Sequence, residues 1–278
     1  MSGKRNSRWY RKAILALAAA FLAAAVWLGI SIATLPSVAG LSSPRAGMVI
    51  TVKDWKGRDR PFVVGPKNPH WTPYGAVPPA LKKAVVAAED ANFYVHEGID
   101  YEAMKEAIRA DLQKGKFVRG GSTITQQLAK NLFLTREKTI TRKVKELVLA
   151  RRLDDVLSKA RILELYLNVV ELGPMVYGVG HAARYYFGGP ASSLTVRECA
   201  FLAAMLPGPK VYNPYRRMDR VMKRSDRILR RMVAARMITQ EEYETALAEV
   251  PNLAGLEKKV EKSLSQPVPG EDGSPSGP

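Results

Sequence analysis

The chain has 278 residues, of which 46% are hydrophobic, so it is long enough for one domain of moderate size with extensions. Its 43 Lys and Arg exceed its 26 Asp and Glu, giving a net charge of +17. This excess favours anionic partners such as nucleic acid, anionic lipid or a phosphorylated substrate, and the alternative is a basic surface that maintains solubility. A single cysteine, Cys199, excludes an intrachain disulfide and a cysteine-based zinc site.

The N-terminal region predicts a membrane anchor. Residues 13–35 carry no charge, and at ~1.5 Å per residue this run spans roughly 34 Å, enough to cross a bilayer core of about 30 Å. Five Lys and Arg side chains lie within residues 1–12, and the positive-inside rule keeps that end cytoplasmic. We predict a retained signal anchor; the alternative is a signal peptide that is cleaved near Ala39.

The remaining chain predicts a neck, one mainly α-helical domain and a tail. Residues 36–77 form the neck, which is rich in Pro and Gly and has short strands predicted at 48–52 and 61–64. Residues 78–250 show helical spacing of apolar residues, interrupted by turn signals. Residues 251–278 predict a disordered tail, because Pro, Gly and Ser dominate its last part. Helices are expected near residues 80–90, 101–114, 123–134, 138–154, 159–171, 178–186, 195–206, 217–236 and 240–248.

The first candidate site residue is Glu89, which ends the apolar stretch of the helix predicted over 80–90. A carboxylate at such an edge is partly desolvated, which makes it a better base near neutral pH. Asp90, Phe93 and His96 follow at once and are candidates for the same site. The alternative is a helix end with solvated charges and a structural histidine.

The second candidate is the segment GGSTITQQLAKN at residues 120–131. Two glycines allow a tight turn, and Thr123 with Gln126 fits a capping box at the start of the next helix, with Ser122 as an alternative cap. We expect the N-terminus of that helix to present free backbone N–H groups, a natural phosphate site. Polar side chains at i,i+4 spacing are expected to share a helix face: Gln126, Gln127, Lys130 and Asn131. The alternative is a well-capped amphipathic helix.

Three further segments carry charge in a helical setting. Arg142 and Lys143 lie within one turn of Glu146, which clusters cations with a carboxylate or forms an ordinary surface salt bridge. Residues 216–236 hold nine Lys or Arg, on a solvated face or a face toward anionic lipid. The helix over 159–171 carries one polar stripe, Arg161, Glu164, Asn168 and Glu171. This stripe is either a structural network in the core or the back wall of a site.

Read in order, the segments EDANFYVHEG, GGSTITQQ, RKVKE, ILELYLN and RSDRIL resemble the five motifs of the family 51 glycosyltransferases. This family comprises the glycosyltransferase domains of penicillin-binding proteins and the monofunctional biosynthetic peptidoglycan transglycosylases. The resemblance runs from about residue 78 to residue 248. It implies a lysozyme-like helical domain preceded by one transmembrane helix, with a small membrane-dipping subdomain supplied by residues 98–119. Only residues 249–278 follow the last predicted helix, so the chain resembles the monofunctional type.

Members of this family polymerise lipid II into β-1,4-linked glycan strands and release undecaprenyl pyrophosphate. By resemblance, Glu89 is expected to be the general base on the acceptor 4-hydroxyl, and Glu146 the second carboxylate at the donor or pyrophosphate side. The cations expected to hold the pyrophosphate are Lys130, Lys138, Arg142 and Lys143. The other expected substrate-binding residues are Asp90, Phe93, His96, Ser122, Thr123, Gln126, Gln127, Asn131 and Asn168.

The resemblance also implies partners and a location. It requires no cofactor and leaves open a divalent cation such as Mg or Mn, whose ligands are unknown. Lipid II, the nascent glycan strand, membrane lipids and other cell-wall synthesis or division proteins are the expected partners, and nucleic acid is not. The expected location is the bacterial inner (cytoplasmic) membrane, with the catalytic domain on the periplasmic, extracytoplasmic side.

Two other functions remain alternatives. A glycan-cleaving lytic transglycosylase would need an acid to protonate a poor leaving oxygen and would have less use for the predicted cation cluster. A non-catalytic, membrane-anchored cell-wall scaffold would leave the paired glutamates without a purpose.

Overall fold

The computed structural model describes residues 3–54, 56–115, 120–135, 137, 139–208 and 211–254, with side chains from Trp9 onward. The fold is mainly α, as predicted, and two small antiparallel hairpins accompany the helices. The helices are α1 (Gly3–Ala33), α2 (Pro79–Glu89), α3 (Tyr101–Lys114), α4 (Ile124–Phe133), α5 (Ile140–Val156), α6 (Lys159–Val169), α7 (Val179–Phe187), α8 (Val196–Met205), α9 (Pro214–Ala234) and α10 (Gln240–Ala248).

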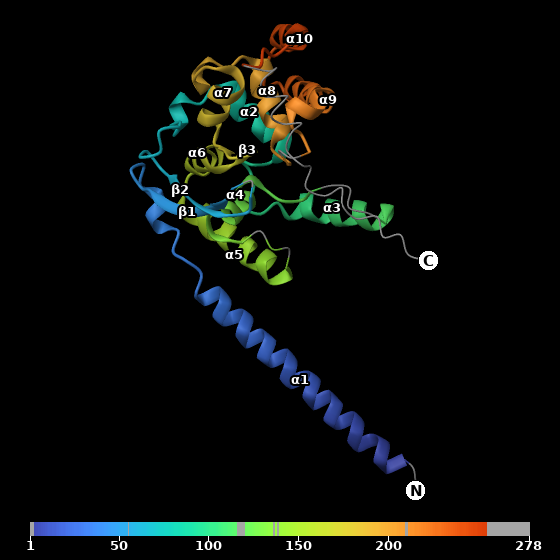
Figure 1. Cartoon of the computed structure of the whole chain (residues 1–278). Coiled ribbons are helices and arrows are strands. Elements are labelled where there is room, and N and C mark those ends of the chain that lie inside the picture. Colours follow the sequence, from blue (N-terminus) through green and yellow to red (C-terminus); the bar gives the residue numbers. More distant parts are fainter. Residues whose placement is uncertain are drawn as a thin grey trace.

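Helix α1 extends away from the rest of the molecule (Figure 1). Its apolar part, Trp9–Ala33, has 25 residues with a mean hydropathy of 2.5, and none of it is buried against the protein. At ~1.5 Å per residue it is about 37 Å long, which by length and composition is enough to cross a bilayer.

The neck contains the predicted hairpin, formed by β1 (Met48–Lys53) and β2 (Asp59–Val64). Asp54 closes its turn by accepting hydrogen bonds from the backbone N–H groups of Lys56 at 2.9 Å and Arg58 at 3.0 Å. One face of the hairpin is buried against the helices, so the strands belong to the packed domain rather than to a free linker.

The helical core is built on α6 and α8, which bury most of their side chains. Helix α8 packs against α2 and α9, and α4 packs against α5 and α6. Figure 1 shows α7–α10 gathered at one end, with α4, α5 and the first hairpin at the end from which α1 leaves. Threonine capping boxes begin α4, α8 and α10, because each cap side chain bonds the N–H three residues on.

A second hairpin, β3 (Glu171–Gly173) with β4 (Val176–Tyr177), stands where the sequence predicts the end of a helix over 159–171. Helix α6 instead ends at Val169. A Cβ on Gly173 would lie 2.4 Å from the Tyr186 hydroxyl, and that hydroxyl donates to the carbonyl of Leu172 at 2.8 Å. Tertiary packing of Tyr186 therefore fixes an extended segment here.

Candidate active site

A cleft of about 700 Å³ opens between the end of α2, the start of α3, the segment that leads into α4, and α9. Its charged lining residues are the acids Glu89, Asp90 and Asp100 and the cations Arg224 and Arg231. Gly120, Gly121, Ser122, Thr123 and Gln127 also line it. The cleft therefore gathers the first two candidate segments of the sequence on one concave surface.

Glu89 is the last residue of α2, and its side chain is 10% exposed. Gln127 of α4 donates to its Oε2 at 3.0 Å, and Arg224 of α9 lies 3.2 Å from its Oε1. The hydroxyl of Tyr166, on α6, donates to Oε1 of Gln127 at 3.0 Å and so fixes the orientation of that amide. The carboxylate of Glu89 is thus held by side chains from α4 and α9, and a side chain from α6 orients the one from α4.

Tyr166 is fully buried. Burial raises the pKa of its hydroxyl well above the usual range, and the neighbouring charges of Glu89 and Asp90 raise it further. The hydroxyl therefore stays protonated, and it remains a donor to Gln127 at neutral pH.

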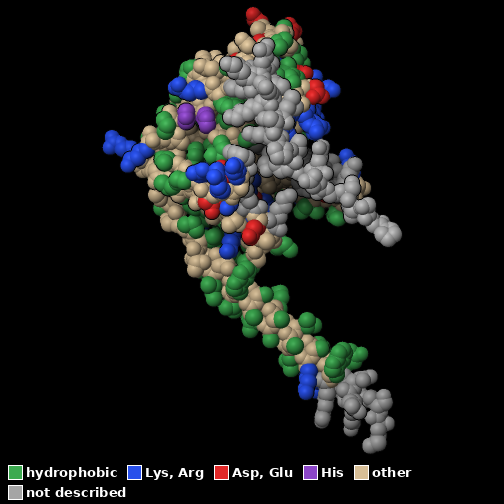
Figure 2. Space-filling model, viewed as in Figure 1, with side chains coloured by type: hydrophobic (Ala, Val, Ile, Leu, Met, Phe, Trp, Pro, Cys, Tyr) green, Lys and Arg blue, Asp and Glu red, His purple; other side chains and the backbone are tan. Residues whose placement is uncertain are grey.

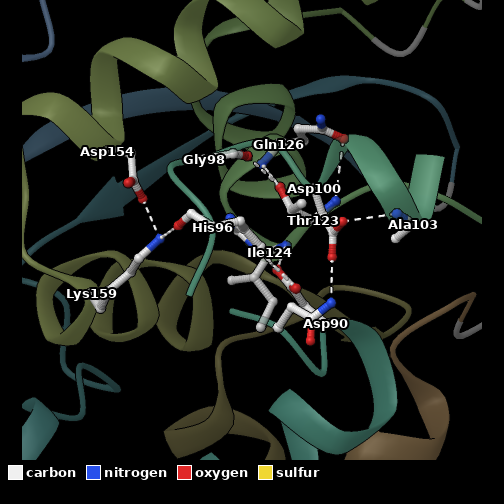
Figure 3. Close-up of polar contacts among 11 residues, drawn as sticks. Asp90, His96, Gly98, Asp100, Ala103, Thr123, Ile124, Gln126, Asp154 and Lys159 are labelled. Carbon is white, nitrogen blue, oxygen red and sulfur yellow. Dashed lines mark hydrogen bonds and ion pairs between the residues drawn. The ribbon is translucent and has the colours of Figure 1, made fainter. Parts of the chain in front are cut away.

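Asp90 joins the end of α2 to the start of α4. Its Oδ2 accepts a hydrogen bond from the backbone N–H of Ile124 at 2.9 Å, and its Oδ1 lies 2.9 Å from Nε2 of His96 (Figure 3). Phe93 is fully buried and packs edge-on to the His96 ring. Asp90, Phe93 and His96 therefore hold the frame of the cleft, and of these three only Asp90 lines it.

The same bond corrects the expectation that the N-terminus of α4 offers free N–H groups to a phosphate. The N–H of Ile124 is bonded to Asp90, and the N–H of Gln126 is bonded to the capping hydroxyl of Thr123 at 3.1 Å. A carboxylate of the protein already occupies the place of the anion, so this expectation was wrong.

Glu146, on α5, is buried at 3% exposure and is paired with two cations. Arg142 lies 2.6 Å from its Oε2, and Lys143 pairs with its Oε1. Lys143 also donates to the hydroxyl of Ser122 at 3.0 Å and to Oε1 of Gln126 at 3.4 Å. This cluster is therefore a partly buried network around a buried carboxylate, connected to the wall of the cleft, rather than a surface salt bridge.

Other predicted site residues lie outside the cleft. Asn168 is buried, and its amide accepts from the N–H of Thr72 at 2.7 Å and donates to the Thr72 carbonyl at 2.8 Å. This places Asn168 in the structural network of the core. Lys130 is exposed and Asn131 half-buried on α4, and neither lines the cleft. Lys138 falls outside the described residues.

The sequence-based reasoning missed Arg224 and Arg231, which it placed on a solvated or lipid-facing helix. The spacing of Val221, Ser225 and Ile228, which are buried on the same helix, indicates which face of the helix packs against the protein but not which residue Arg224 reaches. An arginine adjacent to that buried stripe lies at the edge of the packed face, where it can reach a neighbouring helix. Within the described parts of the chain, no group of three or more His, Cys, Asp or Glu is placed to hold a metal ion.

A sequence model of the family described as Transglycosylase matches residues 61–233, more than half of the chain. The chain belongs to the transglycosylase family. The family predicted from the five motifs is thereby confirmed. The match begins within β2, ahead of the domain start expected at residue 78, and it ends in α9 just beyond Arg231.

Two curated relatives in this transglycosylase family carry informative names. The biosynthetic peptidoglycan transglycosylase of Nitrosospira multiformis is 48% identical over 165 residues, which cover 59% of this chain and 72% of the relative. Penicillin-binding protein 1A of Aquifex aeolicus is 39% identical over 229 residues, which cover 80% of this chain and 31% of the relative. Among solved structures, penicillin-binding protein 1A from Haemophilus influenzae matches at 22% identity with a TM-score of 0.40, covering 74% of this chain and 21% of that one.

Proposed function

We propose that this chain is a peptidoglycan glycosyltransferase that polymerises lipid II into β-1,4-linked glycan strands and releases undecaprenyl pyrophosphate. The observation that carries the proposal is the placement of Glu89, a carboxylate oriented by Arg224 and Gln127 on the wall of a cleft of about 700 Å³. The membership of the transglycosylase family and the names of the relatives support the same reaction.

Glu89 acts as the general base in this proposal. Each of its oxygens has one hydrogen-bond partner given by the structure, and a carboxylate oxygen has two lone pairs, so a lone pair remains for the incoming proton. The acceptor 4-hydroxyl gives its proton to Glu89 while its oxygen attacks the anomeric carbon of the donor. The bond to pyrophosphate breaks on the opposite face, and the configuration at that carbon inverts.

The cluster around Glu146 stabilises the leaving group. Pyrophosphate leaves with its negative charge, so it needs charge stabilisation more than a strong proton donor. Arg142 and Lys143 place two positive charges around one carboxylate, which leaves the cluster with a net positive charge. Lys130 and Lys138 are proposed to extend this positive region toward the pyrophosphate. No metal is obligatory in this scheme, and added Mg²⁺ or Mn²⁺ tests that point.

We also propose that α1 anchors the protein in the cytoplasmic membrane as a single span, with the catalytic domain on the extracytoplasmic side. The length of its apolar part, Trp9–Ala33, and the basic residues before it support this orientation. A membrane-tethered domain with a net charge of +17 suits a lipid-linked polyanionic substrate. Other cell-wall synthesis or division proteins are proposed partners.

The test is polymerisation of purified lipid II by the full chain in detergent. Glu89→Gln keeps the shape of the side chain but removes the base, so its rate should fall about 10²–10⁴-fold. The matched control is Glu97→Gln, which changes a carboxylate that is 73% exposed and pairs with Arg151 away from the cleft. It should polymerise at the wild-type rate.

The other outcomes separate the alternatives. Cleavage of preformed glycan without polymerisation would indicate a lytic enzyme. Wild-type activity in Glu89→Gln would show that Glu89 is not the general base. No activity of the wild type in either assay would favour a scaffold. A parallel series with EDTA, Mg²⁺ and Mn²⁺ measures whether a divalent cation contributes.

A further inference from the structure

The outward face of α9 carries a series of cations. Beyond the irregular backbone at Arg217, α9 is a regular helix, so residues three and four apart share a face. Its inner face buries Val221, Ser225 and Ile228. The exposed cations on its outer side follow one another at spacings of three and four residues. We call this set the α9 cation face, and it consists of Arg220, Lys223, Arg227 and Arg230.

Acidic side chains neutralise little of this face. The acids of α9 are Asp219 and Asp226. Asp226 lies 2.6 Å from the buried Arg197 of α8, and among the described residues the structure shows no ion pair for Asp219 or for the four cations. Cations three or four positions apart repel one another and destabilise a helix. An anionic ligand bound along the face would relieve that repulsion.

The α9 cation face borders the cleft that holds Glu89. Arg224 and Arg231 each stand within one turn of Arg227, and both line the cleft. Arg224 lies 3.2 Å from Glu89, and Arg231 donates to the carbonyl of Ala87 at 3.4 Å. These contacts direct one edge of α9 toward the end of α2. The exposed cations therefore continue outward from the edge of the cleft.

Helix α9 lies away from the end of the domain at which the candidate membrane span leaves. Helix α1 leaves beside α4, α5 and the first hairpin, whereas α9 lies with α7, α8 and α10 at the other end (Figure 1). On the side where Figure 1 places α9, Figure 2 shows Lys and Arg side chains, in blue, at the molecular surface. This position favours a polyanion in the aqueous space over a surface of lipid headgroups.

We propose that the α9 cation face binds the peptide stems of the glycan strand outside the cleft, through their carboxylates; this inference rests on the proposed function. The sugars of such a strand are neutral, and the carboxylates of its peptides are ionised at neutral pH. Arginine binds a carboxylate through paired N–H donors. The 21 residues of α9 span about 31 Å, so several weak contacts along one strand can act together and keep it on the enzyme.

Binding of finished strands tests this proposal without requiring activity. The full chain in detergent is titrated against fluorescent, uncrosslinked glycan strands that carry their peptide stems, and against strands of equal length from which an amidase has removed the peptides. Stem-bearing strands should bind at least tenfold more tightly, and the difference should shrink as the NaCl concentration rises. Equal affinity for the two kinds of strand would overturn the proposal.

A triple variant shows whether the binding belongs to α9. Changing Arg220, Arg227 and Arg230 to Gln should weaken binding of stem-bearing strands at least tenfold. Gln is a good helix former and the change removes repulsion, so the helix should be retained, which circular dichroism and thermal unfolding check. The matched control removes the same charge from exposed cations that do not line the cleft, by changing to Gln Arg45, Lys67 and Arg184. It should alter the affinity less than twofold, and equal weakening by both triple variants would overturn the proposal in favour of general charge.

Two other ligands test the choice of partner. Vesicles of phosphatidylglycerol and phosphatidylcholine, or a single-stranded oligonucleotide, would overturn the proposal if they lost affinity for the triple variant while stem-bearing strands did not. The lipid II assay separates this inference from the proposed function. A wild type that polymerises lipid II but does not bind finished strands overturns this inference alone. A wild type that binds stem-bearing strands through α9 but makes none supports the surface and contradicts the transferase.

Discussion

The carboxylate of Asp90 accepts a hydrogen bond from the backbone N–H of Ile124 at 2.9 Å, across 34 positions of sequence. This bond fastens the last turn of α2, which ends in Glu89, to the first turn of α4, which carries Gln127. The distance between Glu89 and Gln127 therefore depends on Asp90. Positioning of this kind predicts that stability and activity change together.

Asp90→Ala should lower the free energy of unfolding by about 2 kcal/mol, because it leaves a buried N–H and the ring of His96 without their acceptor. The polymerisation rate should fall as well, since Glu89 loses its fixed orientation. Urea unfolding in detergent and the lipid II assay measure the two effects. Asp90→Asn keeps an acceptor for the N–H of Ile124 and should retain more of both. Unchanged stability in Asp90→Ala would contradict the positioning role.

Tyr166→Phe should reduce kcat about tenfold, a loss of about 1.4 kcal/mol in transition-state stabilisation, with little change in KM. The substitution removes only the hydroxyl that orients Gln127, and Gln127 in turn orients Glu89. Tyr186→Phe is the matched control, because it removes a buried hydroxyl that bonds a backbone carbonyl instead. Steady-state kinetics on both variants should separate them. Equal effects on kcat would show that the Tyr166 hydroxyl acts only through stability.

Local patterns in the sequence were sufficient for most of the fold. The apolar spacing and the turn residues predicted helices at the positions of α2–α10 and the hairpin of the neck. The capping box of Thr123 and Gln126 was also predicted and is confirmed, because both partners lie within one turn of each other. Interactions between residues a few positions apart can be predicted from a single sequence.

The contacts that shape the site join residues far apart in the chain, and no local pattern reports them. Arg224 reaches Glu89 across 135 positions, so its role could not be derived from the spacing of α9 alone. The stripe containing Asn168 indicated that a polar group is buried but could not identify Thr72 as its partner. The prediction of free N–H groups at the start of α4 was wrong for the same reason, since Asp90, which accepts from one of them, follows α2 and lies 34 positions earlier in the chain.

Arg161→Leu should lower the free energy of unfolding by about 3 kcal/mol, because it leaves a shielded carboxylate without its partner. Arg161 is 7% exposed and donates to the carbonyls of Leu41 at 2.9 Å and Ser43 at 3.0 Å, while pairing with Glu164 at 3.2 Å. These bonds fasten the segment after α1 to the helical core. Urea unfolding in detergent measures the loss, and limited proteolysis should show faster cleavage near Ser43.

The matched control for this prediction is the double variant Arg161→Leu with Glu164→Leu. Replacing both charges with apolar groups removes the unpaired carboxylate, so this variant should recover part of the lost stability. Faster proteolysis near Ser43 should persist in it, because the two carbonyl bonds stay absent. A single variant as stable as the wild type would show that the neck is held by other contacts.

Asp54 should make the neck hairpin sensitive to acid. Burial alone would raise the pKa of Asp54, but hydrogen bonds from Arg58 and from the backbone of Lys56 outweigh it and lower the pKa from 3.8 to about 2. A lowered pKa in the folded state means that Asp54 stabilises the fold fully above about pH 4 and loses this contribution as the pH falls toward 2. Asp54→Asn should therefore have a lower Tm than the wild type at pH 7, and the difference should shrink by pH 2.

Asp59→Asn changes a carboxylate that is 63% exposed and paired with Lys53, so it should alter Tm little at either pH. A Tm difference for Asp54→Asn that is the same at pH 7 and pH 2 would contradict the stabilising role of the charged form.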